Sequence, residues 1–414
     1  MNHKRWFGFQ FKVLNLVKAL VLSLVLLFPS AVSAVEVLQP ANIERLSADL
    51  NRIVYNIPSA RRSSTFRVKV PFNPGNSSFL FTAVAKSPGA RVSITRVAAP
   101  SGKLTYKFDP RRGLRFFRAL GLSFPLSDTA EVSMLFPMNA KVPVEFGTYT
   151  IDLEIAGGYG LKQVAVIVKG QMGFRQAVDF NIWVAINDPK LKSANFQTEF
   201  GNLIRKQMNA MLTPHKLRVG QLRFYNSTPK ETEGLSRPHV DEVRAMCNLM
   251  KRRVPRNRAV NLIWVDEIFY RPNFTFGGIA AGQPGSLFVS ESSATCVLAA
   301  YNIYGSNLNQ HAINFLHEGS HLMGLPHTSE LDGRSFDKFD DTPECNLGKF
   351  DGRSNPRFGY KGQRNGEVDD YECGIAGGAN NFLFYGGLSD FEPFFISSEQ
   401  AWVLKRHPLF YPVN

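Results

Sequence analysis

Cysteine is missing from the first 246 residues of this 414-residue chain, and the rest contains only Cys247, Cys296, Cys345 and Cys373. No two of them form a CxxC pair, which argues against a structural zinc site made of thiolates. An even number of cysteines in the second half instead predicts two disulfides and an oxidising compartment. Sequence order favours Cys247–Cys296 and Cys345–Cys373, while spacing alone leaves the two other pairings open.

Long apolar runs are missing after residue 34, where no stretch approaches the ~20 residues that a membrane-spanning helix requires. Residues 1–34 have a basic start, an apolar run over residues 19–32 and the small residues Val32-Ser33-Ala34 that signal peptidase needs. We expect cleavage after Ala34 and an exported protein, periplasmic or extracellular, without a stable membrane span. An uncleaved anchor is the alternative, but the apolar run is short and interrupted.

Low-complexity tracts and repeats of fixed period are also missing, which argues against solenoids and propellers. The formal charge of +14 falls to +10 when the four basic residues of the signal peptide are removed. The surplus is densest at residues 251–258 and 111–118, outside any recognisable nucleic-acid-binding motif. We therefore expect no nucleic-acid partner, and interpret the charge as a solvated surface or as an attraction to anionic polymers or acidic substrates.

Residues 35–172 contain short alternating runs separated by turn residues such as Asn73-Pro74-Gly75. Clear runs cover residues 65–70, 79–83, 91–94 and 148–155. This pattern predicts an antiparallel β-sandwich, with one helix around residues 43–53. Because no metal-ligand or catalytic spacing occurs here, we expect a structural, inhibitory or binding role.

Residues 173–414 follow a boundary at residues 169–173 and alternate strands with helices. The pattern predicts strands over residues 178–186, 217–225 and 260–268 and an amphipathic helix over residues 193–212. Such a unit is α/β with a mixed sheet, so we expect the whole chain to be α+β.

Residues 317–327 read HEGSHLMGLPH. We expect a helix over residues 307–323, which places His317 and His321 one turn apart on one face. Gly324 permits the sharp turn that ends the helix, so that His327 can return as a third zinc ligand. Three histidines leave a position for water, as in catalytic zinc sites, and Glu318 can deprotonate that water. The alternative, ordinary histidines on a helix, requires five fixed positions to agree by chance.

This motif resembles that of the metzincin zinc peptidases, whose pattern includes a later tight turn with a methionine beneath the metal. The matching stretch is residues 380–387, where Leu383 stands in place of the methionine. Leucine has a similar volume and can serve as the hydrophobic base. Tyr385 lies where several metzincins have a tyrosine near the metal, and a buried turn aromatic is its alternative role.

Residues 311–414 are most similar to the pappalysin-like group of metzincins, a weaker resemblance extending back to residue 175. The shared features are a DTPEC segment at residues 341–345, Cys373 before the turn and a helix opening at Ser397. The resemblance implies a catalytic domain split by a horizontal cleft. Some members bind calcium near the DTP segment, so Asp337, Asp340 and Asp341 are candidate ligands for Ca²⁺, with solvated loop carboxylates as the alternative.

Residues 276–285 are rich in glycine and precede an expected short strand at residues 286–290. In metzincins the strand bordering the cleft pairs with extended substrate, and glycines let another backbone approach closely. An ordinary flexible loop is the alternative interpretation.

The motif in an exported chain predicts a zinc metalloendopeptidase that acts on protein or peptide substrates. The substitution at Leu383 and the motif-free first half leave a second function open, a zinc-binding adhesion protein with an impaired site. A third is a zinc amidase acting on cell-wall peptides.

Overall fold

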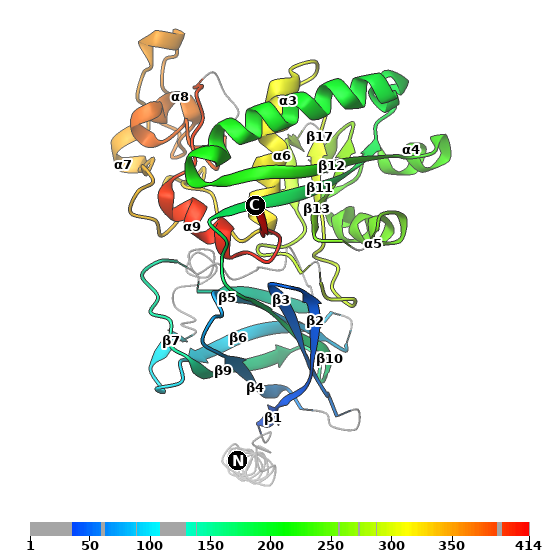
Figure 1. The fold of residues 1–414 in the computed structure, drawn as a ribbon. Helices are drawn as coiled ribbons and strands as arrows, with labels where there is room; N and C mark the ends of the chain where they lie inside the picture. Colours follow the sequence, from blue (N-terminus) through cyan, green and yellow to red (C-terminus); the bar gives the residue numbers. More distant parts are fainter. Residues whose placement is uncertain are drawn as a thin grey trace, which may run out of the picture.

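The computed structural model describes residues 35–58, 63–87, 89–107, 130–137, 139–255, 257–271, 274–286, 288–386 and 391–413. The expected signal peptide and the basic cluster at residues 111–118 lie outside these described residues. No helix in the described ranges is long and apolar enough to cross a membrane. Figure 1 shows the strands of the first half below the helices and strands of the second half, and the α+β class is confirmed.

Ten strands of the first half form two five-stranded sheets. In sheet order, the first contains β1 (Glu36–Leu38), β4 (Thr65–Phe72), β9 (Gly147–Ala156), β6 (Arg91–Ala98) and β7 (Leu104–Lys107). The second contains β2 (Pro40–Ser47), β3 (Leu50–Tyr55), β10 (Leu161–Lys169), β5 (Ser78–Ala85) and β8 (Glu131–Phe136). All pairs are antiparallel except β1–β4, which is parallel. The four predicted runs are strands β4, β5, β6 and β9.

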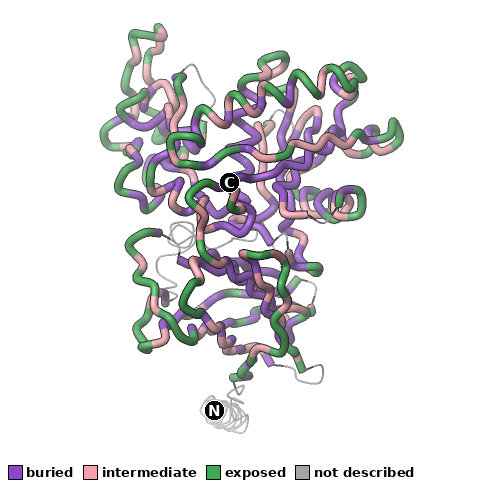
Figure 2. Tube along the Cα trace, viewed as in Figure 1, coloured by how far each residue is buried: buried purple, intermediate pink, exposed green. Residues whose placement is uncertain are grey.

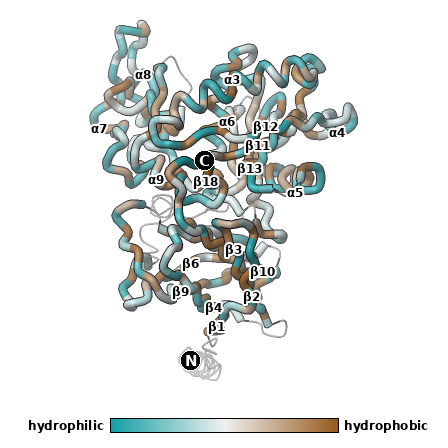
Figure 3. Tube along the Cα trace, viewed as in Figure 1, coloured by the Kyte–Doolittle hydropathy of each residue, from teal (hydrophilic) through white to brown (hydrophobic). Residues whose placement is uncertain are grey.

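The two sheets bury one common set of apolar side chains. Alternation explains this in β4, where Phe66, Val68, Val70 and Phe72 are buried and the residues between them are half-buried. Across the sheets, four aromatic rings pack with centroids 4.6–6.3 Å apart: Phe72, Tyr149, Phe79 and Phe136. Figure 2 shows the buried chain inside both halves, and Figure 3 shows hydrophobic chain around β3 and β10.

The helix predicted at residues 43–53 is wrong, since this segment forms the hairpin of β2 and β3. Ile43 and Leu46 are exposed, whereas Leu50 and Ile53 are buried. Apolar residues three and four positions apart resemble a helical pattern, but β3 pairs along its length with β10. That long-range pairing decides the structure of the segment.

The second half contains a six-stranded mixed sheet, as predicted. Its order is β12 (Leu217–Asn226), β11 (Arg175–Ala185), β13 (Ala259–Val265), β17 (Val297–Ala300) and β16 (Gly278–Ala280), with β18 (Tyr411–Val413) paired to β11. Strands β12, β11, β13 and β17 run parallel, whereas β16 and β18 are antiparallel to their neighbours. A separate hairpin joins β14 (Ile268–Arg271) to β15 (Phe274–Phe276).

The described residues 286 and 288–290 do not form the short strand predicted at residues 286–290, and the edge of the sheet is β16 instead. Ser286 donates its backbone N–H to Ala294, and its hydroxyl meets those of Thr82 and Ser133 in the first half. The backbone N–H of Val289 donates back to Ser286, so the segment turns rather than extends.

Helices cover both faces of the six-stranded sheet (Figure 1). Alternate residues of β11 enter two cores: Ile182 packs with α3 (Ala194–Leu212) and α6 (Leu308–Leu322), whereas Trp183 packs with α5 (Val243–Arg253). The disulfide Cys247–Cys296 joins α5 to the segment before β17, as predicted. The remaining helices are α4 (Pro229–Leu235), α7 (Leu347–Phe350), α8 (Asp370–Cys373) and α9 (Ser398–Arg406). Short 3-10 turns are Pro189–Lys192, Thr213–His215, Val240–Glu242, Pro356–Phe358 and Ile375–Gly377.

Arg258 connects the two halves of the chain. Its guanidinium donates to both carboxylate oxygens of Asp49, at 2.7 and 2.9 Å, in the turn between β2 and β3. It also donates to the backbone oxygens of Pro408 and Phe410 near the carboxyl end. The Arg258 and Asp49 side chains are only 15% and 13% exposed, so the pair is held mostly out of water.

Lys169, at the end of β10, is a second polar link between the halves. Its side chain is fully buried, and its ammonium donates to Gln176 and to the backbone oxygens of Lys405 and His407. Burial lowers the pKa of Lys169 well below its usual value, and the nearby Arg258 adds to this effect. The three acceptors compensate for the lost hydration.

Replacing Asp49 with Ala should lower the free energy of unfolding by about 3–5 kcal/mol, because it leaves the Arg258 charge buried and unpaired. Urea unfolding of the mature protein measures this. Glu44→Ala is the matched control, since its partner Arg52 and Glu44 are 29% and 37% exposed. The control should change stability by less than about 1 kcal/mol. Equal effects of the two substitutions would contradict the assignment.

Candidate metal centre

Helix α6 carries the first part of the motif. Asn307 caps it by accepting a hydrogen bond from the backbone N–H of Gln310, and residues 310–322 are all buried. His317 and His321 lie one turn apart on the same face, with ring centroids 4.7 Å apart. The local helical period therefore brings two imidazoles together, as the sequence predicts.

Gly324 ends the helix and redirects the chain. Its φ of +97° is a left-handed conformation that favours glycine. Leu325 then donates its N–H to the backbone oxygen of Ser320, and the chain turns back so that His327 reaches the other two rings. The Nε2 atoms lie 3.0 Å apart for His317–His321, 3.0 Å for His321–His327 and 3.3 Å for His317–His327.

Hydrogen bonds fix which imidazole nitrogens face one another. Nδ1 of His317 donates to the carbonyl oxygen of Phe382 at 2.6 Å, and Nδ1 of His321 donates to that of Leu325 at 2.7 Å. Because a carbonyl only accepts, each proton lies on Nδ1 and each Nε2 presents a lone pair. Lone pairs that converge in this way repel one another unless a cation lies between them.

The three nitrogens fit a divalent metal ion. In tetrahedral zinc sites Zn–N distances of ~2.0–2.1 Å place ligand nitrogens roughly 3.3 Å apart. The separations of 3.0–3.3 Å are close to this value. In the described part of the chain, His317, His321 and His327 are the one group of ligating side chains whose atoms converge within 4.8 Å.

Burial keeps His317 in the form that binds metals. Loss of hydration lowers its pKa to about 3, and the neighbouring His327 acts in the same direction. A neutral imidazole is the form that metals bind, so His317 needs no deprotonation near neutral pH.

Glu330 contacts the third histidine and was not identified from the sequence. Its Oε2 lies 3.2 Å from Nδ1 of His327. His317 and His321 donate to backbone carbonyls, whereas His327 meets a carboxylate. Such a carboxylate fixes the orientation of a ligand imidazole and increases its basicity. The spacing of three positions between His327 and Glu330 is the sequence feature that could have indicated this contact.

Glu318 follows the first histidine and lies in a dry environment. The residue is 5% exposed, and desolvation raises its pKa to about 8. A cation held by the three histidines would oppose this shift, because it favours the charged carboxylate. The structure therefore places a buried carboxylate beside the histidines, and its pKa would depend on whether a cation is bound there.

The turn that contains Phe382 and Leu383 follows α8 and packs against the segments that carry the histidines. Leu383 is fully buried in the same core as Phe315 of α6. Its carbonyl accepts the N–H of Thr328 at 3.1 Å, directly after the third histidine. Since Phe382 accepts from His317, the turn is bonded to both ligand-bearing segments. Leu383 is therefore a buried apolar residue in a turn that is hydrogen-bonded to the segments carrying His317 and His327.

A buried amide pair holds this turn against α9. Asn381 and Gln400 exchange two hydrogen bonds of 3.1 Å, and both residues are fully buried. The Asn381 side chain also accepts the N–H of Leu383, while Gln400 accepts that of the helix cap Ser397. The predicted helix opening at Ser397 is confirmed. The beginning of α9 is thus linked to the carbonyl that orients His317.

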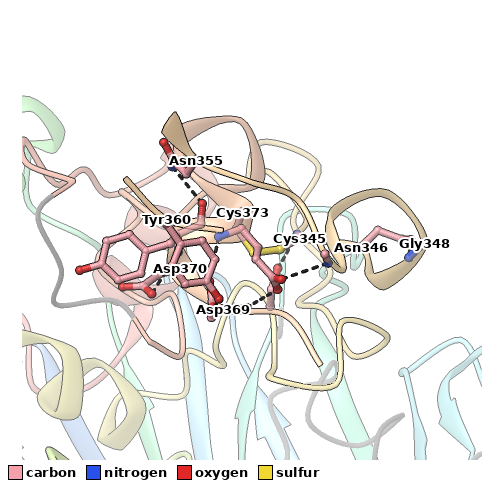
Figure 4. The surroundings of a disulfide bond; sticks show 12 residues. Cys345, Asn346, Gly348, Asn355, Tyr360, Asp369, Asp370 and Cys373 are labelled. Atoms are coloured by element: carbon pink, nitrogen blue, oxygen red, sulfur yellow. Dashed lines mark hydrogen bonds between the residues drawn. A yellow bond between two sulfur atoms is a disulfide. The ribbon is translucent and has the colours of Figure 1, made fainter. Parts of the chain in front are cut away.

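Tyr385 is partly buried and packs against a small core around the disulfide Cys345–Cys373. This disulfide forms as predicted (Figure 4). Its hydroxyl is buried and has no hydrogen-bond partner among the described residues. Burial raises the pKa of Tyr385, and carboxylates such as Asp369 and Asp370 add to the shift. Tyr385 is thus a partly buried aromatic of the turn, with its hydroxyl in the interior.

The disulfide core also reaches the metal ligands. The N–H of Cys345 donates to the side chain of Ser329, two residues after His327, at 2.8 Å. Asp369 caps α8 and accepts the Tyr360 hydroxyl near the disulfide (Figure 4). This arrangement fixes the chain that follows the third histidine.

The three candidate calcium ligands have separate partners. Asp337 is buried within its own loop, and burial raises its pKa to about 7. Asp340 is exposed and pairs with Lys141 at 2.6 Å, while Asp341 accepts the N–H of Glu399. Among the described residues these carboxylates do not form a metal-ligating group. Although Asp337, Asp340 and Asp341 are close in sequence, their carboxylates do not point towards a common position.

We expect Glu330→Ala to weaken zinc binding about 10–100-fold, because His327 loses its orienting carboxylate. Competition with a chromogenic chelator measures the dissociation constant. Glu344→Ala is the control, since Glu344 is an exposed carboxylate of the same loop region. Unchanged zinc affinity in Glu330→Ala would show that the 3.2 Å contact does not support the ligand.

No family model matches this chain, and no curated protein matches it. One solved structure with a detectable similarity is the crystal structure of metalloproteinase-II from Bacteroides fragilis. The match covers 74% of this chain and 78% of that chain, with 11% sequence identity and a TM-score of 0.26. A similarity at this level carries no argument about family or activity, so any functional conclusion depends on the geometry of the site.

Proposed function

We propose that this protein is an exported zinc endopeptidase. In this proposal, a metzincin-like catalytic domain at residues 173–414 follows a β-sandwich domain at residues 35–172. The observation that carries it is the convergence of the Nε2 atoms of His317, His321 and His327 with the buried Glu318 beside them. The two disulfides are consistent with an exported protein.

The chain's own groups have distinct roles in peptide hydrolysis. Zinc, when bound, polarises the scissile carbonyl and lowers the pKa of water towards ~7. Glu318 accepts a proton from the attacking water and then donates it to the leaving amine. His317, His321 and His327 would hold the metal through Nε2 and keep their orientation through their Nδ1 partners.

Replacing Glu318 with Gln should reduce kcat by about 10²–10⁴-fold, because the isosteric amide cannot accept the proton. The assay is cleavage of a broad peptide library by the mature protein. A metal chelator should abolish the parental activity, and added zinc should restore it. Glu344→Gln is the control and should retain the parental rate. Equal cleavage by Glu318→Gln and the parent would overturn the mechanism.

Tyr385 is better explained by packing than by contact with the substrate, because its hydroxyl is buried without a partner among the described side chains. We expect Tyr385→Phe to keep kcat within about twofold of the parent and to leave folding unchanged, since the lost hydroxyl makes no net contribution. Steady-state kinetics and thermal unfolding test this. A tenfold or larger loss of kcat would instead assign the phenol to stabilisation of the oxyanion.

A zinc-binding adhesion protein is the second candidate, favoured by Leu383 in place of methionine. It predicts bound zinc and no chelator-sensitive hydrolysis of any substrate. Leu383 fills its position without exposure, so the geometry supports activity more than impairment. A panel of proteins, peptidoglycan and small amides separates the peptidase from an amidase acting on cell-wall peptides.

A further inference from the structure

Strand β16 lies directly against the zinc helix. The carbonyl oxygen of Gly277, just before β16, accepts hydrogen bonds from the Asn314 side chain at 2.7 Å and from the N–H of Ala300 at 2.8 Å. Asn314 is buried on α6, one turn before Glu318 and on the same face of the helix. The edge of the sheet is therefore held to the helix at the level of the general base.

Gly278 is in contact with the general base. A Cβ at this position would overlap Cγ, Cδ and Oε1 of Glu318. The preceding Gly277 is also crowded, since a Cβ there would overlap the hydroxyl of Tyr304. Neither glycine has a positive φ, so their backbone conformation does not require glycine. The requirement is close approach, in which a bare backbone lets a side chain lie against the strand.

The contact restricts where the carboxylate of Glu318 can lie. A glutamate side chain has three rotatable bonds, and a base must be held close to its productive position for efficient proton transfer. On one side the helix fixes the Cα of Glu318, and on the other the backbone of Gly278 blocks part of the space. Asn314 holds that backbone in place.

We propose that Gly278 is a positioning residue, whose bare backbone sets the place of the Glu318 carboxylate. Its effect on catalysis rests on the proposed function, whereas its contact with Glu318 does not. Any side chain at residue 278 displaces the carboxylate from the ligand set and leaves the histidines in place.

A stability cycle tests the contact independently of activity. We expect Gly278→Ala to lower Tm by at least about 2 °C in the parent and by much less in the Glu318→Ala background, where the overlapping atoms are absent. Gly234→Ala is the control, since a Cβ there meets nothing within 4 Å. If Gly278→Ala alone fails to fold, Gly278→Ala/Glu318→Ala should fold again. Equal loss of Tm in both backgrounds, or a double variant that still fails to fold, overturns the proposal.

Kinetics test the positioning role. Gly278→Ala should lower kcat roughly 10²-fold, as for a catalytic group misplaced by about 1 Å, with KM and zinc affinity unchanged. In the Glu318→Gln background it should change kcat less than about twofold, because its effect acts through Glu318. An undiminished loss in that background overturns the proposal. If the parent shows no zinc-dependent hydrolysis, the proposed function is refuted instead. The stability cycle then tests by itself whether Gly278 and Glu318 are in contact.

Discussion

Three imidazole lone pairs point at one another across 3.0–3.3 Å, and the rest of the second half is arranged to hold them there. Such an arrangement is unfavourable without a cation, because it brings acceptors together in a buried place. Two backbone carbonyls and one carboxylate prevent the rings from turning to relieve it. A divalent metal between the three nitrogens would relieve this repulsion and would therefore stabilise the fold.

The supports of the site come from segments far apart in the chain. Phe382 holds His317, and the buried pair of Asn381 and Gln400 connects that carbonyl to α9. The disulfide Cys345–Cys373 anchors the segment after His327 through Ser329. In this way the carboxy-terminal helix supports the carbonyl that orients His317, and the disulfide loop holds the segment that follows His327.

The first half contributes directly to the core that surrounds helix α6. Leu50, Leu80, Leu135 and Ile167 belong to the same hydrophobic core as Phe315 of α6. Glu131 of β8 pairs with Arg244 of α5, and both side chains are largely buried. These contacts, with the Asp49–Arg258 pair, join the halves through apolar and charged groups. The strands of the first half therefore share a core and buried ion pairs with the second half.

The sequence by itself determined what is local. The spacing of His317 and His321, the left-handed turn at Gly324 and the helix caps follow from the period and ends of a single helix, and the structure contains all of them. The residues near 43–53 show where local patterns fail, because an apolar spacing typical of a helix was overridden by pairing with β10.

Only the tertiary structure decided which distant groups meet. Glu330 on His327, Gly278 on Glu318 and the separate partners of the three candidate calcium ligands depend on loops that pack against one another. Sequence spacing has no information about such contacts, since they join segments whose relative positions are set by the whole core. The sequence of one helix and its turn thus determines which histidines come together. The fold around them determines the orientation of the three rings and the position of the Glu318 side chain.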